Sequence, residues 1–425
     1  MKKTVALHNL GCKVNAYELE AIQQLLEDRG YEIVPFAPGA DVYIINTCTV
    51  TNIADRKSRQ MLHKAKKMNP DAVVVACGCY VQAAGEKLEE DTAIDLIIGN
   101  NKKKDLVDIL ENFLAEREDG GKPSDAECKS FLVDMTHNRE YETLSISKTA
   151  EHTRAFLKVQ DGCNQFCTYC IIPYARGRVR SRRQSDVVEE VKRLVEAGYQ
   201  EVVLTGIHLS SYGLDFPEGE KETLLDLIRA VDAVDGIRRI RLGSLEPGII
   251  TEEFAEAIAA MPKVCPHFHL SLQSGSNGTL KRMNRKYTAE EYKHKCDLLR
   301  KVYGNPALTT DVIVGFPQES EEEFEESRAF VEDIHSSRLT SSSIREEKAP
   351  ALQRWQARFR SRRRRSAAMF CWNWTRDGDR NIWKASSEKS WKCSWKKKSR
   401  STASITGRDT RENICALPFF QKKIS

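Results

Sequence analysis

Short apolar runs alternate with amphipathic helical stretches in two series, and this alternation constrains the fold more than any other feature. The first series lies within residues 3–116 and contains the runs TVALHNLG, DVYIINT, AVVVACG and AIDLIIG. The second contains RAFLKVQ, EVVLTG, IRRIRLGS, HFHLSLQ and ALTTDVIVGFP. Repeated strand–helix–strand order produces a parallel sheet covered by helices. The sequence therefore predicts an α/β protein, with an N-terminal parallel-sheet βα domain followed by a partial (β/α) barrel.

Four segments follow from this pattern. Residues 117–150 contain EDGGKPSDAECKS, lack any periodicity and read as a linker. We therefore predict an N-terminal domain at 1–116, a linker at 117–150, the partial barrel at 151–335 and an aberrant tail at 336–425.

The tail departs from the pattern in composition and in periodicity. A sixth barrel strand is due after the helical stretch ESEEEFEESRAFVEDIH, and the sequence offers no clear one there. From Ser336 onward there are 23 Lys and Arg against 7 Asp and Glu, and all 6 tryptophans of the chain lie at or after Trp355. A basic disordered tail that binds nucleic acid is one interpretation, and translation out of frame after about His335 is the other. We favour the second, because the break falls inside an expected βα unit, and we expect no packed domain in the tail.

Composition places the protein in a reducing compartment. No run approaches the roughly 18 apolar residues of a spanning helix, and the start MKKTVALHNLGCKVN becomes polar too early for a signal peptide. These features predict a cytoplasmic protein without a membrane partner. In such a compartment the 13 cysteines are expected to serve as metal ligands or reactive thiols more often than as disulfides.

Three cysteines with CxxxCxxC spacing follow the first barrel strand: Cys163, Cys167 and Cys170. Zinc and 4Fe-4S sites usually take four protein ligands, so three thiolates leave one position open. An iron with an open position can bind a substrate or a cofactor, and this is the interpretation we favour. The alternative is a zinc knuckle completed by His152 or by a remote residue.

A second trio is dispersed along the N-terminal domain. Cys12, Cys48 and Cys79 each follow an apolar run of the first series. Because parallel strands end at one edge of the sheet, these three can converge there and hold a second cluster. Cys77 falls within its apolar run and is expected to be a small buried residue. The alternative is that all three are core residues.

Several motifs in one order carry a resemblance to a known family. LGCKVN, NTCTVTNIADRKSRQ, GCYVQ, GCNQFCTYCIIPYARGRVRSR, LTGIHLSSYG, LQSGSNGTLKRMNRKYT and DVIVGFP span about Thr4 to Ile334. They resemble the radical S-adenosylmethionine methylthiotransferases, and GCKVN, CTVTN and LTGIH resemble the branch that modifies N6-threonylcarbamoyladenosine in tRNA. One departure is Gln318, where the family usually has glycine.

The resemblance implies a radical SAM barrel, two 4Fe-4S clusters and S-adenosyl-L-methionine. The cluster of Cys163, Cys167 and Cys170 would generate a radical that abstracts hydrogen from C2 of the adenine. Sulfur would come from the cluster of Cys12, Cys48 and Cys79, and a second cofactor molecule would supply the methyl group. The family's cofactor contacts correspond to residues at strand ends: Thr205, Gly206, Gln273, Asp311 and Gly315. Gln273, Asp311 and Gly315 could equally be plain scaffold, and a glycine at a strand end such as Gly206 is more often only a turn.

The segment RGRVRSRR is the expected RNA contact. It contributes arginines beside the mouth of the expected site: Arg176, Arg178, Arg180, Arg182 and Arg183. On an otherwise acidic body, such a strip favours phosphate contacts, although a solvated loop would read the same way. The anticodon stem-loop of tRNA is thus the expected partner, together with an electron donor protein and a sulfur donor that the sequence does not identify.

Three other functions remain open at this point. The chain could be a catalytically impaired Fe-S protein that binds RNA. It could also be a methylthiotransferase that acts on isopentenyladenosine or on a ribosomal protein.

Overall fold

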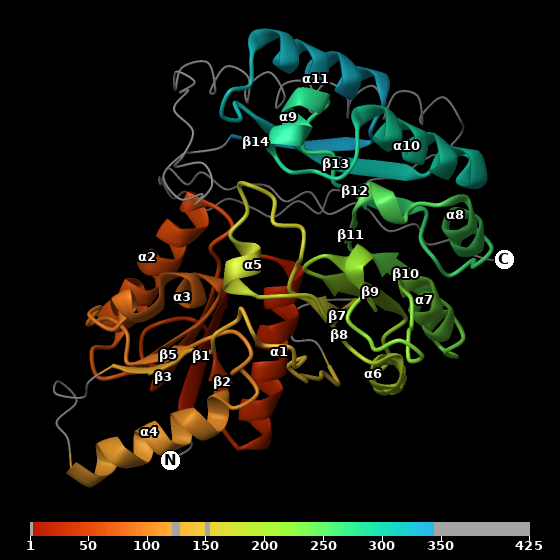
Figure 1. Ribbon diagram of the computed structural model, residues 1–425. Helices are drawn as coiled ribbons and strands as arrows, with labels where there is room; N and C mark the ends of the chain where they lie inside the picture. The colour runs from red at the N-terminus through yellow and green to blue at the C-terminus, as the bar shows by residue number, and fades with distance from the viewer. Residues whose placement is uncertain (1–2, 121–127, 149–153, 344–425) are drawn as a thin grey trace, which may run out of the picture. The chain divides into compact units, whose positions relative to one another are not determined.

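The N-terminal part forms a six-stranded parallel sheet in the computed structural model, which describes residues 3–120, 128–148 and 154–343 (Figure 1). The order of the strands across the sheet is β2-β1-β3-β4-β5-β6. The strands are β1 (Thr4–Asn9), β2 (Glu32–Val34), β3 (Val42–Thr47), β4 (Val73–Gly78), β5 (Leu96–Ile98) and β6 (Lys129–Phe131). The strand order reverses between β1 and β3, and open α/β sheets of this kind bind ligands at the carboxyl ends of the strands beside that point.

Helices cover both faces of this sheet. They are α1 (Lys13–Asp28), α2 (Asn52–Met68), α3 (Cys79–Ala84) and α4 (Leu106–Gly120), with a short 3-10 turn η1 (Gly85–Leu88). Alternate residues of the strands enter two separate cores: Val75 packs with Ile22 of α1, whereas Val74 packs with Leu62 of α2. Two covered faces require strands that are apolar throughout, as the sequence pattern indicated.

The predicted linker is partly structured, and the N-terminal domain extends beyond residue 116. Helix α4 continues to Gly120, and Lys129–Phe131 adds strand β6 beside β5. Farther along, Leu144 and Ile146 are buried against Tyr17 of α1 and the core of the barrel. A three-residue strand is too short to display a period, which is why this segment read as a linker.

The second part forms the predicted partial barrel. Its strands are β7 (Ala155–Asp161), β8 (Arg180–Ser181), β9 (Glu201–Gly206), β10 (Arg239–Leu242), β11 (Ser244–Leu245), β12 (His267–Leu270), β13 (Ala307–Val314) and β14 (Arg338–Ser343). They form two four-stranded groups, β10-β9-β7-β8 and β11-β12-β13-β14, and every pairing is parallel except that of β8 with β7.

Helices follow the barrel strands in the expected alternation. They are α5 (Ile172–Ala175), α6 (Gln184–Glu196), α7 (Leu224–Asp232), α8 (Glu252–Ala259), α9 (Asn277–Arg282), α10 (Ala289–Tyr303) and α11 (Glu321–Asp333), with 3-10 turns η2 (Leu209–Ser211) and η3 (Pro247–Ile249). Capping boxes fix the starts of α7, α10 and α11, at Thr223, Thr288 and Ser320. The α/β fold class with a parallel-sheet domain and a partial barrel is thereby confirmed.

The sixth barrel strand is present, contrary to the prediction. Strand β14 lies parallel to β13 over its whole length, from Thr309 opposite Arg338 to Val314 opposite Ser343. Only Leu339 supplies a large apolar side chain, which is buried, so the serine-rich sequence gave no strand pattern. The regular barrel therefore continues past His335, and the predictions about the tail after residue 343 lie outside the described residues.

Candidate functional site

The N-terminal cysteine trio lies at the carboxyl ends of three neighbouring strands. Cys12 follows β1, Cys48 follows β3 directly and Cys79 follows β4 directly, and these strands are adjacent in the sheet. Gly11 has φ +111° and faces Cys48 so closely that a side chain there would collide with it. The sequence prediction that this trio converges at one sheet edge agrees with this placement.

Cys77 and Cys79 have different environments. Cys77 is completely buried within β4, and its thiol donates to the carbonyl oxygen of Ile45 at 3.7 Å. Cys79 begins α3, because Gly78 at φ +96° turns the chain out of the strand. The sulfur of Cys79 accepts the Nε–H of Arg176 at 3.1 Å. A charged donor on the sulfur suits a thiolate, so Cys79 is the better ligand of the two.

The second trio lies in the loop that leaves β7. Cys163 donates its backbone N–H to the oxygen of Gly177 at 3.0 Å, and Cys170 donates to the oxygen of Cys167 at 3.0 Å. Burial raises the pKa of the Cys163 thiol to about 11 and that of Cys170 to about 12. Deprotonation here therefore needs a cation to replace the proton, which a metal centre supplies.

Both trios have the donor chemistry of Fe-S clusters. Across residues 3–120, 128–148 and 154–343, no three His, Cys, Asp or Glu side chains are placed to hold a single metal ion. A four-iron cube spreads its thiolates farther apart, since each thiolate binds a different iron. Three soft thiolates suit such a cube, whereas His152, the candidate fourth ligand of a zinc site, lies outside the described residues.

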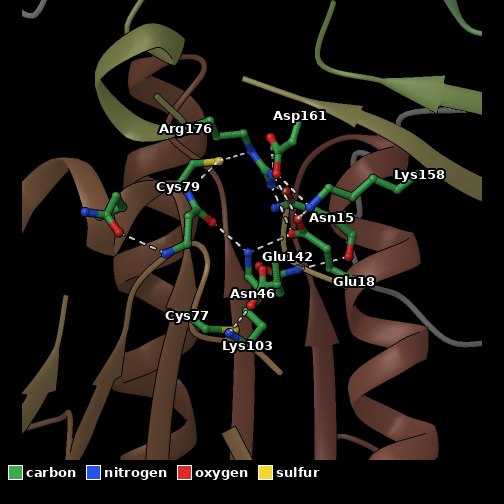
Figure 2. Close-up of polar contacts among 12 residues, drawn as sticks. Asn15, Glu18, Asn46, Cys77, Cys79, Lys103, Glu142, Lys158, Asp161 and Arg176 are labelled. Carbon is green, nitrogen blue, oxygen red and sulfur yellow. Dashed lines mark hydrogen bonds and ion pairs between the residues drawn. The ribbon is translucent and has the colours of Figure 1, made fainter. Parts of the chain in front are cut away.

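A buried ionic network connects the two cysteine sites (Figure 2). Glu18 of α1 accepts from Lys103 and Lys158, each at 2.8 Å, and from both terminal nitrogens of Arg176. Burial alone would raise the pKa of Glu18, but these three cations hold it well below its usual range. Arg176 and Lys158 also pair with Asp161, two residues before Cys163.

The expected arginine strip is mostly interior. Arg176, Arg180 and Arg182 are at most 3% exposed, so these three cannot be the predicted phosphate contacts. Arg176 joins the network above, Arg180 faces Asp161 and Arg182 pairs with Glu190. The two others are partly exposed: Arg178 lies over the ring of Phe166 at 4.5 Å, and Arg183 pairs with Glu220. An alternating RGRVRSRR pattern reads as basic surface, but three of its five arginines face buried carboxylates.

Four of the five predicted cofactor contacts lie at or just after strand ends of the barrel, whereas Asp311 lies inside β13, contrary to the prediction. Thr205 and Gly206 end β9, where a Cβ on Gly206 would lie 2.8 Å from Oε1 of Gln160. Gln273 follows β12 with φ +71° and donates its N–H to the oxygen of Asp311. Gly315 directly follows β13 and donates its N–H to Glu319 at 2.5 Å.

Sequence reasoning missed a polar group beside the second trio. Glu246, after β11, accepts from His208 Nε2 and Gln165 Nε2, each at 2.9 Å. Arg285 approaches Glu246 at 3.5 Å and donates to the sulfur of Cys167 at 3.4 Å. Gln165 sits inside the CNQFC segment, and its position between two candidate ligands was the available indication.

An aromatic surface beside the same loop was also missed. Tyr174 is 56% exposed and contacts the ring of Phe166 edge-on, with centroids 6.0 Å apart. Phe166 adopts φ +48°, and the side chain of Asn284 donates to its carbonyl oxygen at 3.1 Å. Arg178 lies over the ring of Phe166, and we call Phe166, Tyr174 and Arg178 the loop aromatic group.

Comparison with family models assigns both parts of the chain. Residues 157–331 match the Radical SAM superfamily, and residues 4–99 match the uncharacterized protein family UPF0004. Within the described part of the chain, no helix has the length and apolar character needed to cross a membrane.

Curated relatives resemble the chain over most of its length. It is 43% identical to the threonylcarbamoyladenosine tRNA methylthiotransferase MtaB of Bacillus subtilis, over 79% of this chain and 72% of the relative. The MtaB of Aquifex aeolicus is also 43% identical, over 78% and 77% of the two chains. A tRNA-2-methylthio-N(6)-dimethylallyladenosine synthase of Carboxydothermus hydrogenoformans is 36% identical, over 76% and 72%.

Solved structures share the fold at low identity. The radical S-adenosylmethionine methyltransferase TsrM of Kitasatospora setae superposes with a TM-score of 0.58 and 17% identity, covering 80% of this chain and 73% of TsrM. The cobalamin-dependent radical enzyme OxsB gives a TM-score of 0.53 at 12% identity, over 83% and 54%. These two likenesses concern the fold alone.

Proposed function

Because the chain belongs to the threonylcarbamoyladenosine tRNA methylthiotransferase family, we propose that its two cysteine trios hold the two 4Fe-4S clusters with which it performs that reaction. It is a radical SAM transferase that modifies tRNA, and its cofactors are S-adenosyl-L-methionine and the two clusters. The isopentenyladenosine alternative is less favoured, since the dimethylallyladenosine synthase of Carboxydothermus hydrogenoformans is 36% identical to this chain, whereas the MtaB proteins of Bacillus subtilis and Aquifex aeolicus are each 43% identical.

When bound, the clusters and the cofactor supply radical chemistry, sulfur and a methyl group for C2 of the adenine. Cys163, Cys167 and Cys170 would hold the cluster that works with S-adenosylmethionine, and Cys12, Cys48 and Cys79 the auxiliary cluster. The single observation that carries this assignment is that each trio lies at carboxyl ends of parallel strands, the first after β1, β3 and β4 and the second in the loop after β7, where α/β folds bind their ligands.

The protein's own residues orient these sites. Arg285 donates to the sulfur of Cys167 and approaches Glu246, so it would fix one ligand and offset its charge. Asn284 donates to the backbone oxygens of Gln165 and Phe166 and thereby restrains the loop between Cys163 and Cys167. Thr205, Gly206, Gln273, Asp311 and Gly315 are proposed to line the cofactor site.

The loop aromatic group is the proposed contact for unstacked bases of the tRNA anticodon loop. Single-stranded RNA bases stack on exposed aromatic side chains and on guanidinium planes. Tyr174 and Arg178 lie within eight residues of Cys170 and remain accessible, whereas the arginines at 176, 180 and 182 are buried. The reaction class also requires an electron donor protein and a sulfur donor, and a tRNA substrate implies a cytoplasmic location.

Iron content and product formation test the proposal together. The full-length chain, reconstituted anaerobically, should bind about eight irons, because each trio can hold a four-iron cube. Alanine at all three of Cys163, Cys167 and Cys170 should leave about four, and alanine at Cys12, Cys48 and Cys79 should also leave about four. With dithionite, the intact protein should release 5'-deoxyadenosine and methylthiolate an anticodon stem-loop that carries threonylcarbamoyladenosine.

Two results would overturn it. Iron that stays near the intact value in either triple variant rejects the ligand assignment. A chain that carries both clusters but releases no 5'-deoxyadenosine is the impaired RNA-binding protein of the alternative.

A further inference from the structure

Arg176 is fully buried, and every N–H of its guanidinium has a partner. Nε donates to the sulfur of Cys79 at 3.1 Å. One terminal nitrogen donates to Glu18 at 2.8 Å and to Asp161 at 3.2 Å, and the other donates to Asn15 at 2.8 Å and to Glu18 at 3.0 Å. A guanidinium has five N–H donors in a rigid plane, so four oxygen contacts fix the direction of the fifth, toward the sulfur.

These partners come from both halves of the enzyme. Glu18 and Cys79 belong to elements of the N-terminal sheet domain, whereas Asp161 ends β7 of the barrel. Arg176 itself caps α5, the short helix that follows the CxxxCxxC loop, and Asn100 fixes this helix by donating to the oxygen of Ala175 at 2.7 Å. Figure 2 shows the guanidinium lying between Cys79 on one side and Glu18 and Asp161 on the other.

The buried groups around Arg176 carry an excess of positive charge. In the described residues the network contains four buried cations and three buried carboxylates: Lys103, Lys158, Arg176 and Arg180 against Glu18, Glu142 and Asp161. An uncompensated buried charge is strongly destabilising. The guanidinium of Arg176 therefore suits a Cys79 sulfur that serves as a metal ligand, because a cationic donor offsets the charge of a metal-bound thiolate.

We propose that Arg176 is a positioning residue for the auxiliary cluster. From the side of the SAM cluster, Arg176 orients the Cys79 ligand, and its positive charge raises the reduction potential of the auxiliary cluster. This inference rests on the proposed function, which assigns Cys79 to that cluster. A cationic donor on a ligand sulfur stabilises the reduced cluster, because reduction adds negative charge. The same guanidinium pairs with Asp161, which precedes the CxxxCxxC loop. Arg176 therefore also fixes the position of the auxiliary cluster relative to that loop.

The test measures the midpoint potential of the auxiliary cluster in the full-length chain. Alanine at Cys163, Cys167 and Cys170 removes the other cluster, so that electron paramagnetic resonance during a redox titration reports the auxiliary cluster alone. Arg176→Gln should lower the equilibrium constant for reduction of the cluster about tenfold, which lowers the midpoint potential by about 59 mV for one electron. Arg176→Lys keeps the charge but loses the planar fork and should give a smaller shift in the same direction.

Arg182→Lys is the matched control. Arg182 is also buried and pairs with Glu190, while its other contacts shown here are Tyr17 and a backbone oxygen, not a sulfur. The Arg182→Lys variant should keep the wild-type midpoint potential, although this substitution too can lower the free energy of unfolding. A purely structural role for Arg176 would predict equal potentials in all these chains.

Each outcome decides the question. A full auxiliary cluster at the wild-type potential in both Arg176 variants overturns the inference. In the chain with both trios intact, loss of the auxiliary iron alone in the Arg176 variants supports it, whereas loss of both clusters together shows a general folding role and rejects it. If the triple alanine chain with Arg176 intact holds no iron, the failure lies in the proposed function and not in the role of Arg176.

Discussion

A methyl group on Gly11 would lie 2.9 Å from the Cβ of Cys48 and 3.0 Å from its sulfur. Gly11, which precedes the proposed ligand Cys12, thus faces the proposed ligand Cys48 with no room for a side chain. Gly11→Ala should therefore displace Cys48 and reduce the iron bound at the auxiliary site, measured as total iron falling from about eight toward four.

Gly39→Ala provides the matched control for this change. Gly39 has φ +109°, close to the +111° of Gly11, but nothing lies within 4 Å of its Cβ position. Both variants carry similar backbone strain, of roughly 1 to 3 kcal/mol, so only the collision with Cys48 differs. Equal iron loss in the two variants would show that strain, and not the space around Cys48, is responsible.

The two cysteines near the end of β4 should respond differently to replacement by serine. Cys79→Ser should lose the auxiliary iron, because its sulfur faces the Arg176 guanidinium at the sheet edge. Cys77→Ser should retain it, since Cys77 is enclosed within the strand. Iron analysis of both reconstituted chains checks this, and the reverse pattern would exchange the assignment of the two residues.

Gln318 adopts φ +65°, a left-handed conformation that side chains other than glycine rarely take. A side chain would be tolerated at this position with a negative φ, and Gln318 does not have one. Gln318→Gly should raise the free energy of unfolding by about 0.5 to 1 kcal/mol, the strain relieved less the added freedom of the unfolded chain.

Gln318→Ala should give no such gain, because alanine is strained at the same φ. Denaturant titrations of the three chains measure the difference. A gain with alanine equal to that with glycine would assign the effect to loss of the exposed glutamine side chain.

Glu319, the residue after Gln318, makes the free energy of unfolding depend on pH. Burial raises the pKa of this carboxyl to about 7, although the backbone N–H groups of Gly315 and Phe316 lower it in part. Between the unfolded value of about 4.3 and 7, the folded chain holds a proton that the unfolded chain has released, so this group lowers stability as pH rises.

Glu319→Gln should remove that loss. Relative to wild type, its free energy of unfolding should increase by an amount on the order of 3 kcal/mol between pH 4.5 and pH 7.5. Urea titrations of both chains at several pH values measure the difference. Parallel pH profiles would show that Glu319 ionises normally.

Base stacking on Tyr174 predicts a selective loss of RNA affinity. Tyr174→Ala should weaken binding of the anticodon stem-loop by roughly 1 to 3 kcal/mol, whereas Tyr174→Phe keeps the ring and should bind nearly as wild type. Fluorescence anisotropy with labelled RNA at two salt concentrations measures both. Wild-type affinity in the alanine variant would remove Tyr174 from the interface.

The strand–helix pattern predicted the fold well because long apolar runs define buried strands directly. Strand β9 at Glu201–Gly206 matches the run EVVLTG from end to end. The prediction failed where strands carry few apolar residues: β6 has three residues, and β14 reads RLTSSS. Their place is set by the strand beside them, which a local pattern does not record.

Spacing also predicted where the six cysteines lie, since a position after a strand determines the sheet edge it reaches. It could not separate buried from exposed arginines. Arg176 and Arg178 are two residues apart in the same basic segment, yet one meets Glu18, 158 residues earlier in the chain, and the other covers Phe166. Partners so distant in sequence leave no trace in a charge pattern.

The partners of Arg176 also have a consequence for how the enzyme is made. Asn15, Glu18 and Cys79 leave the ribosome long before Asp161 and Arg176, so the pocket around the Cys79 sulfur is incomplete during much of synthesis. Contacts between such distant segments form late in folding. Iron that reached the N-terminal cysteines before the barrel had docked would therefore meet a site without the Arg176 guanidinium.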